Sequence, residues 1–99
     1  MMPKYTLSPL AIEDLRDIWR YGYEQWGLTQ TENYGEKLLT AFDFLAENPK
    51  AGASIEHIRA GYRKHPTGSH LIIYRLAPDC VEVIRILHKN ADTERHLQS

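Results

Sequence analysis

Two amphipathic helices joined by a very short link are the feature that most constrains how this 99-residue chain can fold. The first helix is predicted to end before Gly27, a residue suited to the position just past a helix end. Thr29 and Glu32 have the spacing of a capping box, in which each side chain satisfies a free backbone donor at a helix start. A link of about two residues between long helices forces an antiparallel helical hairpin.

The outer ends of this hairpin also carry clear signals. Ser8 fits the N-cap position of the first helix, and Pro9 fits its first turn, where a missing N–H costs nothing. Asn48-Pro49 ends the second helix, because the residue before a proline disfavours the helical conformation. Apolar residues recur at helical spacing in both helices. They are Ala11, Leu15, Ile18, Trp19, Gly22 and Trp26 in the first, and Tyr34, Leu38, Ala41, Phe42 and Leu45 in the second. We expect the large aromatic members of this set, Trp19, Trp26, Tyr34 and Phe42, to be core residues.

Strand candidates flank the hairpin in the sequence. Residues 4–7 precede it, and residues 62–65, 70–76 and 81–88 follow it. The last two segments are rich in residues that favour strands. Residues 92–97 are predicted to add a final helical turn.

The connections between the later strands define the fold class. Turns are predicted over residues 66–69 and 77–80, and turns this short imply an antiparallel meander. The order β-α-α-β-β-β predicts an α+β protein in which a helical hairpin packs on one face of a mainly antiparallel four-stranded sheet. The other face of such a sheet can stay open to solvent or to a partner.

Length and composition narrow the class of protein. Residues 1–99 are predicted to form one domain, and the apolar fraction of 42% is ordinary for a globular one. No apolar run reaches the roughly 18 residues of a membrane span, and the first residues do not resemble a signal peptide. One cysteine, Cys80, excludes an intramolecular disulfide. We therefore expect a cytoplasmic protein that does not contact a membrane.

Five histidines raise the question of a metal site. His57, His65, His70, His88 and His96 lack the tight spacing of metal ligands, and the chain has no cysteine pair. It also lacks a glycine-rich phosphate loop and a Gly-x-Ser-x-Gly elbow. We therefore predict neither a metal ion nor a cofactor.

Basic residues gather in the later strands, so the C-terminal half is mildly basic, which points to an anionic partner. The group consists of Arg63, His65, Arg75, Arg85, His88 and Lys89. Its charge is far below that of a dedicated DNA-binding domain. Strand alternation predicts that Arg85 shares a face with Val83 and Leu87, and that His88 falls on the opposite face with Ile84 and Ile86.

Two interpretations of the basic group follow from the residues. Arginines beside a histidine suit a metal-free ribonuclease, which binds the scissile phosphate and moves its proton. Alternatively, the arginines neutralise acids such as Glu82 or lie solvated on an open sheet face.

Nearly the whole chain resembles ParE toxins, segment by segment and in the same order. The segments are LSPLA at 7–11, DLRDI at 14–18, EQWG at 24–27, LAENP at 45–49, IRAGYR at 58–63, GSHLIIYR at 68–75 and VIRILH at 83–88. Asp92 followed by Arg95-His96-Leu97 is similar to the usual ending of the family.

The resemblance implies a RelE/ParE fold and a toxin of a type II toxin–antitoxin system. Such a toxin inhibits DNA gyrase by stabilising its cleaved DNA complex and is neutralised by a ParD-like antitoxin, whose tail packs along the helical hairpin and the sheet. It is not an enzyme, and it meets nucleic acid only indirectly, through gyrase or the antitoxin.

RelE toxins share the fold and supply an alternative, ribosome-dependent cleavage of mRNA. In that case His88, Arg63 and Arg85 would be catalytic. The residues after His88 carry no tyrosine and gain acids, and the dense positive charge of the nucleases is missing, so we favour ParE. A third alternative is an inactive toxin homologue that acts only in the antitoxin complex and in autoregulation.

Site residues are predicted for both partners of a ParE toxin. Candidates for contact with the target are Arg63, Arg75, Arg85, His88, Lys89 and Arg95 in the basic C-terminal half. Candidates for the antitoxin are apolar residues expected to be exposed on the hairpin and sheet: Trp19, Tyr23, Leu39, Phe42 and Tyr74.

Overall fold

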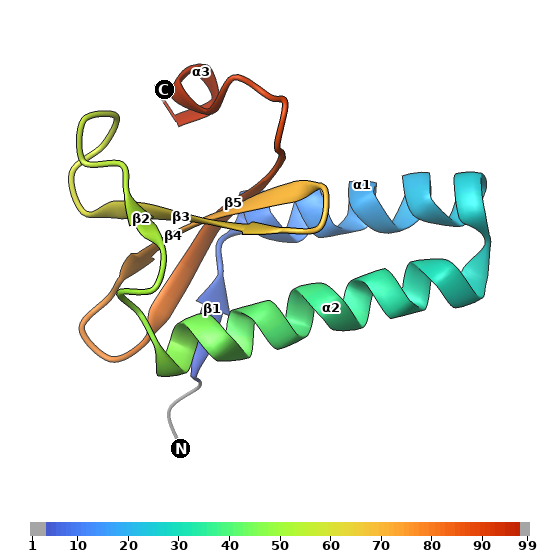
Figure 1. Cartoon of the computed structure of the whole chain (residues 1–99), viewed down its shortest axis with the longest axis horizontal. Helices are drawn as coiled ribbons and strands as arrows, with labels where there is room; N and C mark the ends of the chain where they lie inside the picture. Colours follow the sequence, from blue (N-terminus) through green and yellow to red (C-terminus); the bar gives the residue numbers. More distant parts are fainter. Residues whose placement is uncertain (1–3, 98–99) are drawn as a thin grey trace.

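The computed structural model describes residues 4–97, and these residues have the predicted α+β class (Figure 1). Five strands form one sheet in the order β1-β5-β4-β3-β2, in which β1 pairs with β5 in parallel and the other neighbours are antiparallel. The short β2 is the strand that the sequence did not predict. The elements are β1 (Tyr5–Leu7), α1 (Pro9–Trp26), α2 (Leu28–Glu47), β2 (Ala53–Ser54), β3 (Tyr62–Thr67), β4 (His70–Leu76), β5 (Val81–His88) and α3 (Thr93–Leu97).

The helical hairpin forms as predicted, with a tighter corner. Ser8 accepts a hydrogen bond from the backbone N–H of Ala11 at 3.0 Å, which confirms it as the N-cap of α1. Gly27, with a φ of 83°, is the only residue between α1 and α2. The capping box of Thr29 and Glu32 was wrong, because α2 begins at Leu28 and has no side-chain cap. A single glycine can make this corner because a residue without a side chain adopts a positive φ at little cost in free energy.

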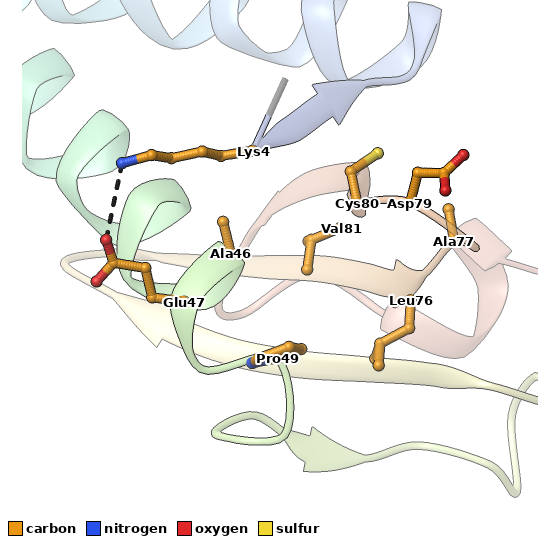
Figure 2. Close-up of a pocket in the computed structure, with 9 residues that line it drawn as sticks. All are labelled: Lys4, Ala46, Glu47, Pro49, Leu76, Ala77, Asp79, Cys80 and Val81. Carbon is orange, nitrogen blue, oxygen red and sulfur yellow. Dashed lines mark ion pairs between the residues drawn. The ribbon is translucent and has the colours of Figure 1, made fainter. Parts of the chain in front are cut away.

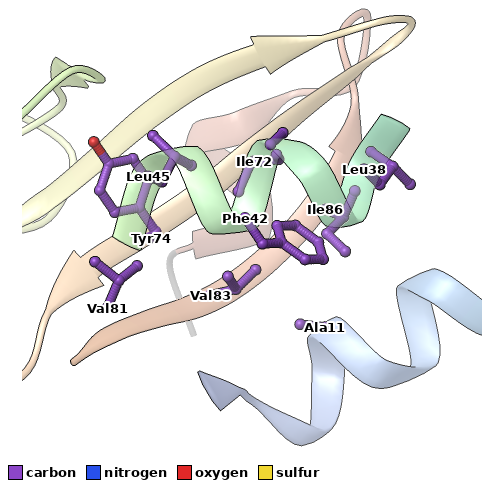
Figure 3. Close-up of a cluster of buried hydrophobic side chains, with 10 residues drawn as sticks. Ala11, Leu38, Phe42, Leu45, Ile72, Tyr74, Val81, Val83 and Ile86 are labelled. Atoms are coloured by element: carbon purple, nitrogen blue, oxygen red, sulfur yellow. The ribbon is translucent and has the colours of Figure 1, made fainter. Parts of the chain in front are cut away.

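The main core lies between the helical hairpin and one face of the sheet (Figure 3). Phe42 of α2 is fully buried there and lies against the ring of Tyr5, with centroids 5.4 Å apart. The other buried members come from α1, α2, β4 and β5 and include Ala11, Leu38, Leu45, Ile72, Tyr74, Val81, Val83 and Ile86. This cluster holds the hairpin on the sheet.

The opposite face of the sheet is also covered, contrary to the open face that the sequence allowed. Ile73 of β4 and Leu87 of β5 pack there against Ile55 and against Leu97 of α3. Arg59 holds these two covering segments together by donating a hydrogen bond to the Leu97 carbonyl at 3.1 Å. Part of this sheet face is therefore a second small core and not a free surface.

An irregularity in β5 changes which residues share a face. In the pairing of β4 with β5, Ile73 lies opposite Arg85 but Tyr74 lies opposite Val83, so one residue of β5 is extra. Such a bulge breaks the alternation of side chains. Leu87 belongs to the second core and Val83 to the main core, so the prediction that these two share a face was wrong. Ile84 packs against the second core and Ile86 belongs to the main core, so the prediction that they share a face was also wrong.

The β3–β4 hairpin has a shorter turn than predicted. Pro66 and Thr67 belong to β3, and only Gly68 and Ser69 form the turn. Gly68 has a φ of 58°, and a Cβ atom at this position would lie 2.7 Å from the ring of Tyr34. A glycine is required here for both reasons.

The corner of the helical hairpin projects beyond the sheet (Figure 1). An α1 of 18 residues is about 27 Å long and covers the sheet only along its first part. Trp19 and Trp26 are therefore 44% and 51% exposed, and their prediction as core residues was wrong. Among residues 4–97, no helix is long and apolar enough to span a membrane.

Candidate functional site

A cleft of about 530 Å³ opens between α1 and the end of the β4–β5 pair, and we name it the α1–β5 cleft. Its walls combine exposed aromatic side chains with titratable ones. Tyr21 and Trp26 form an edge-to-face pair on the helical side, with centroids 5.8 Å apart, and both are more than half exposed. The other wall carries His70, His88 and His96. The sequence did not predict that Tyr21 and Trp26 line a cleft. How far the hairpin projects beyond the sheet, which leaves these side chains exposed, depends on the tertiary fold.

An ion pair between α1 and β5 lies in the floor of the α1–β5 cleft. Arg85 donates two hydrogen bonds to Asp14, from Nε to Oδ2 at 2.9 Å and from its second terminal nitrogen to Oδ1 at 3.0 Å. The Asp14 carboxylate also accepts the backbone N–H of Ile86 at 2.9 Å. The pKa of Arg85 is raised, chiefly by its hydrogen bond to Asp14. Arg85 is thus a structural residue whose charge is already neutralised.

The other two strand arginines are also engaged. Arg63 donates a hydrogen bond to the Gly52 carbonyl at 2.7 Å and ties β3 to the segment before β2. Arg75 pairs with Glu82 at 2.6 Å, the acid that the sequence suggested, and this hydrogen bond raises the pKa of Arg75. Neither arginine lines the α1–β5 cleft.

The residues proposed for a nuclease do not converge on one site. In the sheet, Arg63 lies opposite Tyr74 and His88 lies opposite His70. His70 and Tyr74 are four positions apart on β4, a distance of about 13 Å along the strand. Because Arg85 is also occupied by Asp14, the three residues form no shared phosphate pocket.

Four of the basic candidates are exposed, Arg75, His88, Lys89 and Arg95, and Arg75 is the one of these that pairs with Glu82. His88 lines the α1–β5 cleft, and Lys89 follows it directly at the end of β5. The His88 Nδ1 atom accepts the backbone N–H of Asn90 at 3.2 Å. This end of the sheet therefore presents basic side chains beside an apolar cleft.

A second exposed surface runs along the outside of the helical hairpin, and we name it the outer groove. It consists of Leu15, Trp19, Tyr23, Gly35 and Leu39. The Trp19 ring lies directly over Gly35, where a Cβ atom would be at an ordinary contact distance of 3.5 Å. Arg16 and Arg20 border the groove on the α1 side, and Glu32 and Glu36 border it on the α2 side. Of the antitoxin candidates, Trp19, Tyr23 and Leu39 lie here and are 44%, 56% and 47% exposed.

The remaining antitoxin candidates, Phe42 and Tyr74, are fully buried, so their prediction as exposed residues was wrong. The hydroxyl of Tyr74 donates to the Pro49 carbonyl at 2.7 Å and accepts the Gly52 N–H at 2.8 Å. Burial raises the pKa of this hydroxyl. Tyr74 is therefore a buried brace for the segment between α2 and β2 and not a contact residue.

A shallower pocket of about 440 Å³ lies at the other end of the sheet, next to the β4–β5 turn (Figure 2). Lys4 and Glu47 form an ion pair across it at 3.7 Å, and both side chains are about two thirds exposed. Exposed pairs of this kind contribute little stability. Cys80 is the one nucleophilic side chain that lines this pocket.

Within residues 4–97, no group of three or more His, Cys, Asp or Glu side chains is arranged to hold a metal ion. His70 and His88 are neighbours, with ring centroids 5.7 Å apart.

Comparisons with known proteins bear on the whole chain. Residues 5–93 match the family described as "ParE toxin of type II toxin-antitoxin system, parDE". A "Toxin ParE1" of Mycobacterium tuberculosis is 41% identical over 98 residues, which cover 98% of this chain and 100% of that protein. A "Toxin ParE1" of Caulobacter vibrioides is 41% identical over 96 residues, which cover 97% of this chain and 99% of that protein.

A solved structure described as "Chromosomal ParDE TA system from P. aeruginosa" has a similar fold. Its TM-score to this chain is 0.74 at 15% sequence identity, and the match covers 85% of this chain and 92% of the other. At that identity the likeness concerns the fold alone.

Proposed function

Because the chain belongs to the ParE toxin family of type II toxin–antitoxin systems, we propose that it inhibits DNA gyrase by stabilising the cleaved DNA complex. The protein acts as a binding partner of its target and does not turn over a substrate. The observation that carries this proposal is the dispersal of the strand arginines. Arg63, Arg75 and Arg85 each bind another group of the protein, and they do not form the positive pocket that phosphate-ester cleavage needs.

The target contacts that we propose lie at the mouth of the α1–β5 cleft. His88, Lys89 and Arg95 are the exposed basic candidates other than Arg75, which pairs with Glu82. Exposed aromatic side chains stand on the opposite wall, and aromatic and basic residues together are typical of protein contact sites with a few dominant residues. Arg63 and Arg85 are only partly exposed and bind other groups of the protein, so they support the fold around this surface.

Substitutions at this surface test the proposed contacts. His88→Ala and Arg95→Ala are each expected to raise the concentration of toxin needed for half-maximal DNA cleavage by gyrase by about tenfold, since each removes a contact of about 1.4 kcal/mol. The assay uses gyrase, supercoiled plasmid and ATP, and measures linear DNA. Lys50→Ala is the control, because Lys50 is exposed in the loop after α2, away from the cleft. Equal activity of His88→Ala, Arg95→Ala and Lys50→Ala would contradict this site but not the target.

A ParD-like antitoxin is the second partner that we propose, and it binds the outer groove. The groove is apolar along its floor and has arginines on one edge and glutamates on the other. An amphipathic helix fits a groove of this kind, with its apolar stripe inward and opposite charges along its two edges. Covering Trp19 and Tyr23 would also remove a large exposed aromatic surface from water.

Antitoxin binding should depend on the floor of the outer groove. Trp19→Ala is expected to weaken binding by about 30-fold or more, and Leu39→Ala by about tenfold, because buried aromatic contacts dominate such interfaces. Isothermal titration calorimetry with the antitoxin encoded beside the toxin measures both. Leu10→Ala is the matched control, since Leu10 is 51% exposed and lies nine residues before Trp19, on the opposite side of α1. Equal affinities for Trp19→Ala and Leu10→Ala would place the antitoxin elsewhere.

A further inference from the structure

A cluster of two histidines and a tyrosine connects α2 to the β3–β4 turn and to the end of β5. We propose that Tyr34, His70 and His88 form a proton-sensitive latch, which holds this turn on α2 while His70 is neutral and loosens it when His70 binds a proton. The latch lies in the wall of the α1–β5 cleft, which both His70 and Tyr34 line.

The hydroxyl of Tyr34 is the centre of the latch. It accepts the backbone N–H of Ser69 at 3.0 Å and lies 2.6 Å from Nδ1 of His70. The carbonyl of Thr67 is 3.4 Å away, which is long for a hydrogen bond from a hydroxyl. One helix side chain thus contacts both the last residue of the turn and the first residue of β4.

The hydrogen bonds of the latch depend on the charge of His70. A neutral ring that carries its proton on Nε2 accepts the Tyr34 hydroxyl proton at Nδ1, while the hydroxyl oxygen accepts from Ser69. A second proton on the ring would occupy Nδ1, which then has to donate to the same oxygen. The hydroxyl proton of Tyr34 is left with the Thr67 carbonyl, at the long distance of 3.4 Å. Protonation therefore makes His70 and Ser69 donate to the same hydroxyl oxygen, and it leaves the hydroxyl proton only the long contact to Thr67.

The surroundings of His70 also oppose its positive charge. Burial lowers the pKa of His70 below the ordinary value, His88 lowers it further, and Asp14 acts in the opposite direction. Arg85 of β5 holds Asp14 in a bidentate pair, so this carboxylate is already shared. Asp17 of α1 and His96 of the C-terminal segment also line the cleft, and Tyr34 is the facing group from α2.

The linkage between protons and stability has a definite sign. Because folding lowers the pKa of His70, the unfolded chain takes up this proton more readily than the folded protein. The stability due to neutral His70 is complete above the unfolded pKa of about 6.5 and is lost as the pH falls from there through the folded pKa. The loosening should extend to the end of β5, because Ser69 accepts the backbone N–H of Lys89 at 2.9 Å.

Nuclear magnetic resonance of the whole protein tests the latch by following the ring signals of the histidines between pH 8 and pH 4.5. In the wild type, His70 is expected to titrate below about 6.5. In Tyr34→Phe, its midpoint should rise toward that value, since the neutral ring loses its hydrogen-bond donor. Tyr23→Phe is the matched control, because Tyr23 is exposed and lies outside the cleft lining.

A second variant and an amide-exchange measurement test the latch independently of Tyr34→Phe. His88→Asn should also raise the His70 midpoint, because it removes the neighbouring ring. In the wild type, amide exchange at Ser69, corrected for intrinsic rates, should accelerate at least tenfold as the pH falls and His70 is protonated. In Tyr34→Phe, this exchange should be fast both at pH 8 and at pH 4.5. A wild-type midpoint at or above about 6.5, an unchanged midpoint in Tyr34→Phe, or pH-independent protection of Ser69 would each overturn the latch.

Discussion

Phe42→Ala is expected to lower the free energy of unfolding by about 4 kcal/mol, because it removes a fully buried aromatic ring and leaves a cavity. The ring lies in the main core between α2 and the sheet and contacts Tyr5. A domain of this size has a total stability of about 5–15 kcal/mol, so the variant should unfold at much lower denaturant concentration or fail to accumulate. Urea unfolding followed by circular dichroism measures the change.

The same substitution two residues further along α2 provides the control for Phe42. Phe44 is 45% exposed and points away from the core, so Phe44→Ala is expected to cost less than about 1 kcal/mol. The comparison also separates two roles for Phe42, which the sequence suggested as an antitoxin contact. Loss of antitoxin binding by Phe42→Ala with unchanged stability would contradict its burial.

Asp14→Ala is expected to destabilise the protein by about 3 kcal/mol, because it leaves Arg85 without its partner. The two side chains are only 14% and 16% exposed, so solvent compensates little for the lost carboxylate. The backbone N–H of Ile86 also loses its acceptor. Thermal and urea unfolding at pH 7 measure the effect.

Asp17→Ala is the matched control for Asp14 on the same helix. Its carboxylate is 75% exposed and lies 3.9 Å from Arg20, so its removal should cost less than about 0.5 kcal/mol. In a double-mutant cycle, Asp14→Ala combined with Arg85→Ala should cost less than the sum of the two single changes. Equal stability of Asp14→Ala and Asp17→Ala would show that the ion pair contributes little.

The sequence predicted the helical hairpin and the meander well, because their signals are local. Ser8 before Pro9 and Asn48 before Pro49 define helix ends through the backbone of a few neighbouring residues. The short turns of the meander likewise require antiparallel neighbours. Even here the capping box at Thr29 was overridden, because Gly27 alone turns the chain.

The surfaces could not be predicted from local signals. Whether a residue is exposed depends on how far the hairpin projects past the sheet, which leaves Trp26 outside and draws Tyr74 inside. The bulge in β5 adds one residue to the register, and this single change moves the following side chains to the other face. A pattern of alternating residues contains no sign of such an insertion.

The basic residues of the C-terminal half illustrate the same limit. The sequence suggested that strand arginines neutralise acids such as Glu82, and Arg75 is the one that pairs with Glu82 across adjacent strands. The partner of Arg85 is Asp14, 71 positions earlier in the chain, and only the packing of α1 on β5 brings the two together. Three other exposed residues, His88, Lys89 and Arg95, are the part that we propose for the target.

Two parallel reactions with the purified wild-type protein distinguish a gyrase poison from a nuclease. One contains gyrase, supercoiled plasmid and ATP, and the other contains ribosomes with bound mRNA. We expect gyrase-dependent linear plasmid, suppressed by a ParD-like antitoxin, and intact mRNA. Cleaved mRNA with untouched plasmid would refute the proposed gyrase inhibition and assign the protein to the ribosome-dependent nucleases of the same fold.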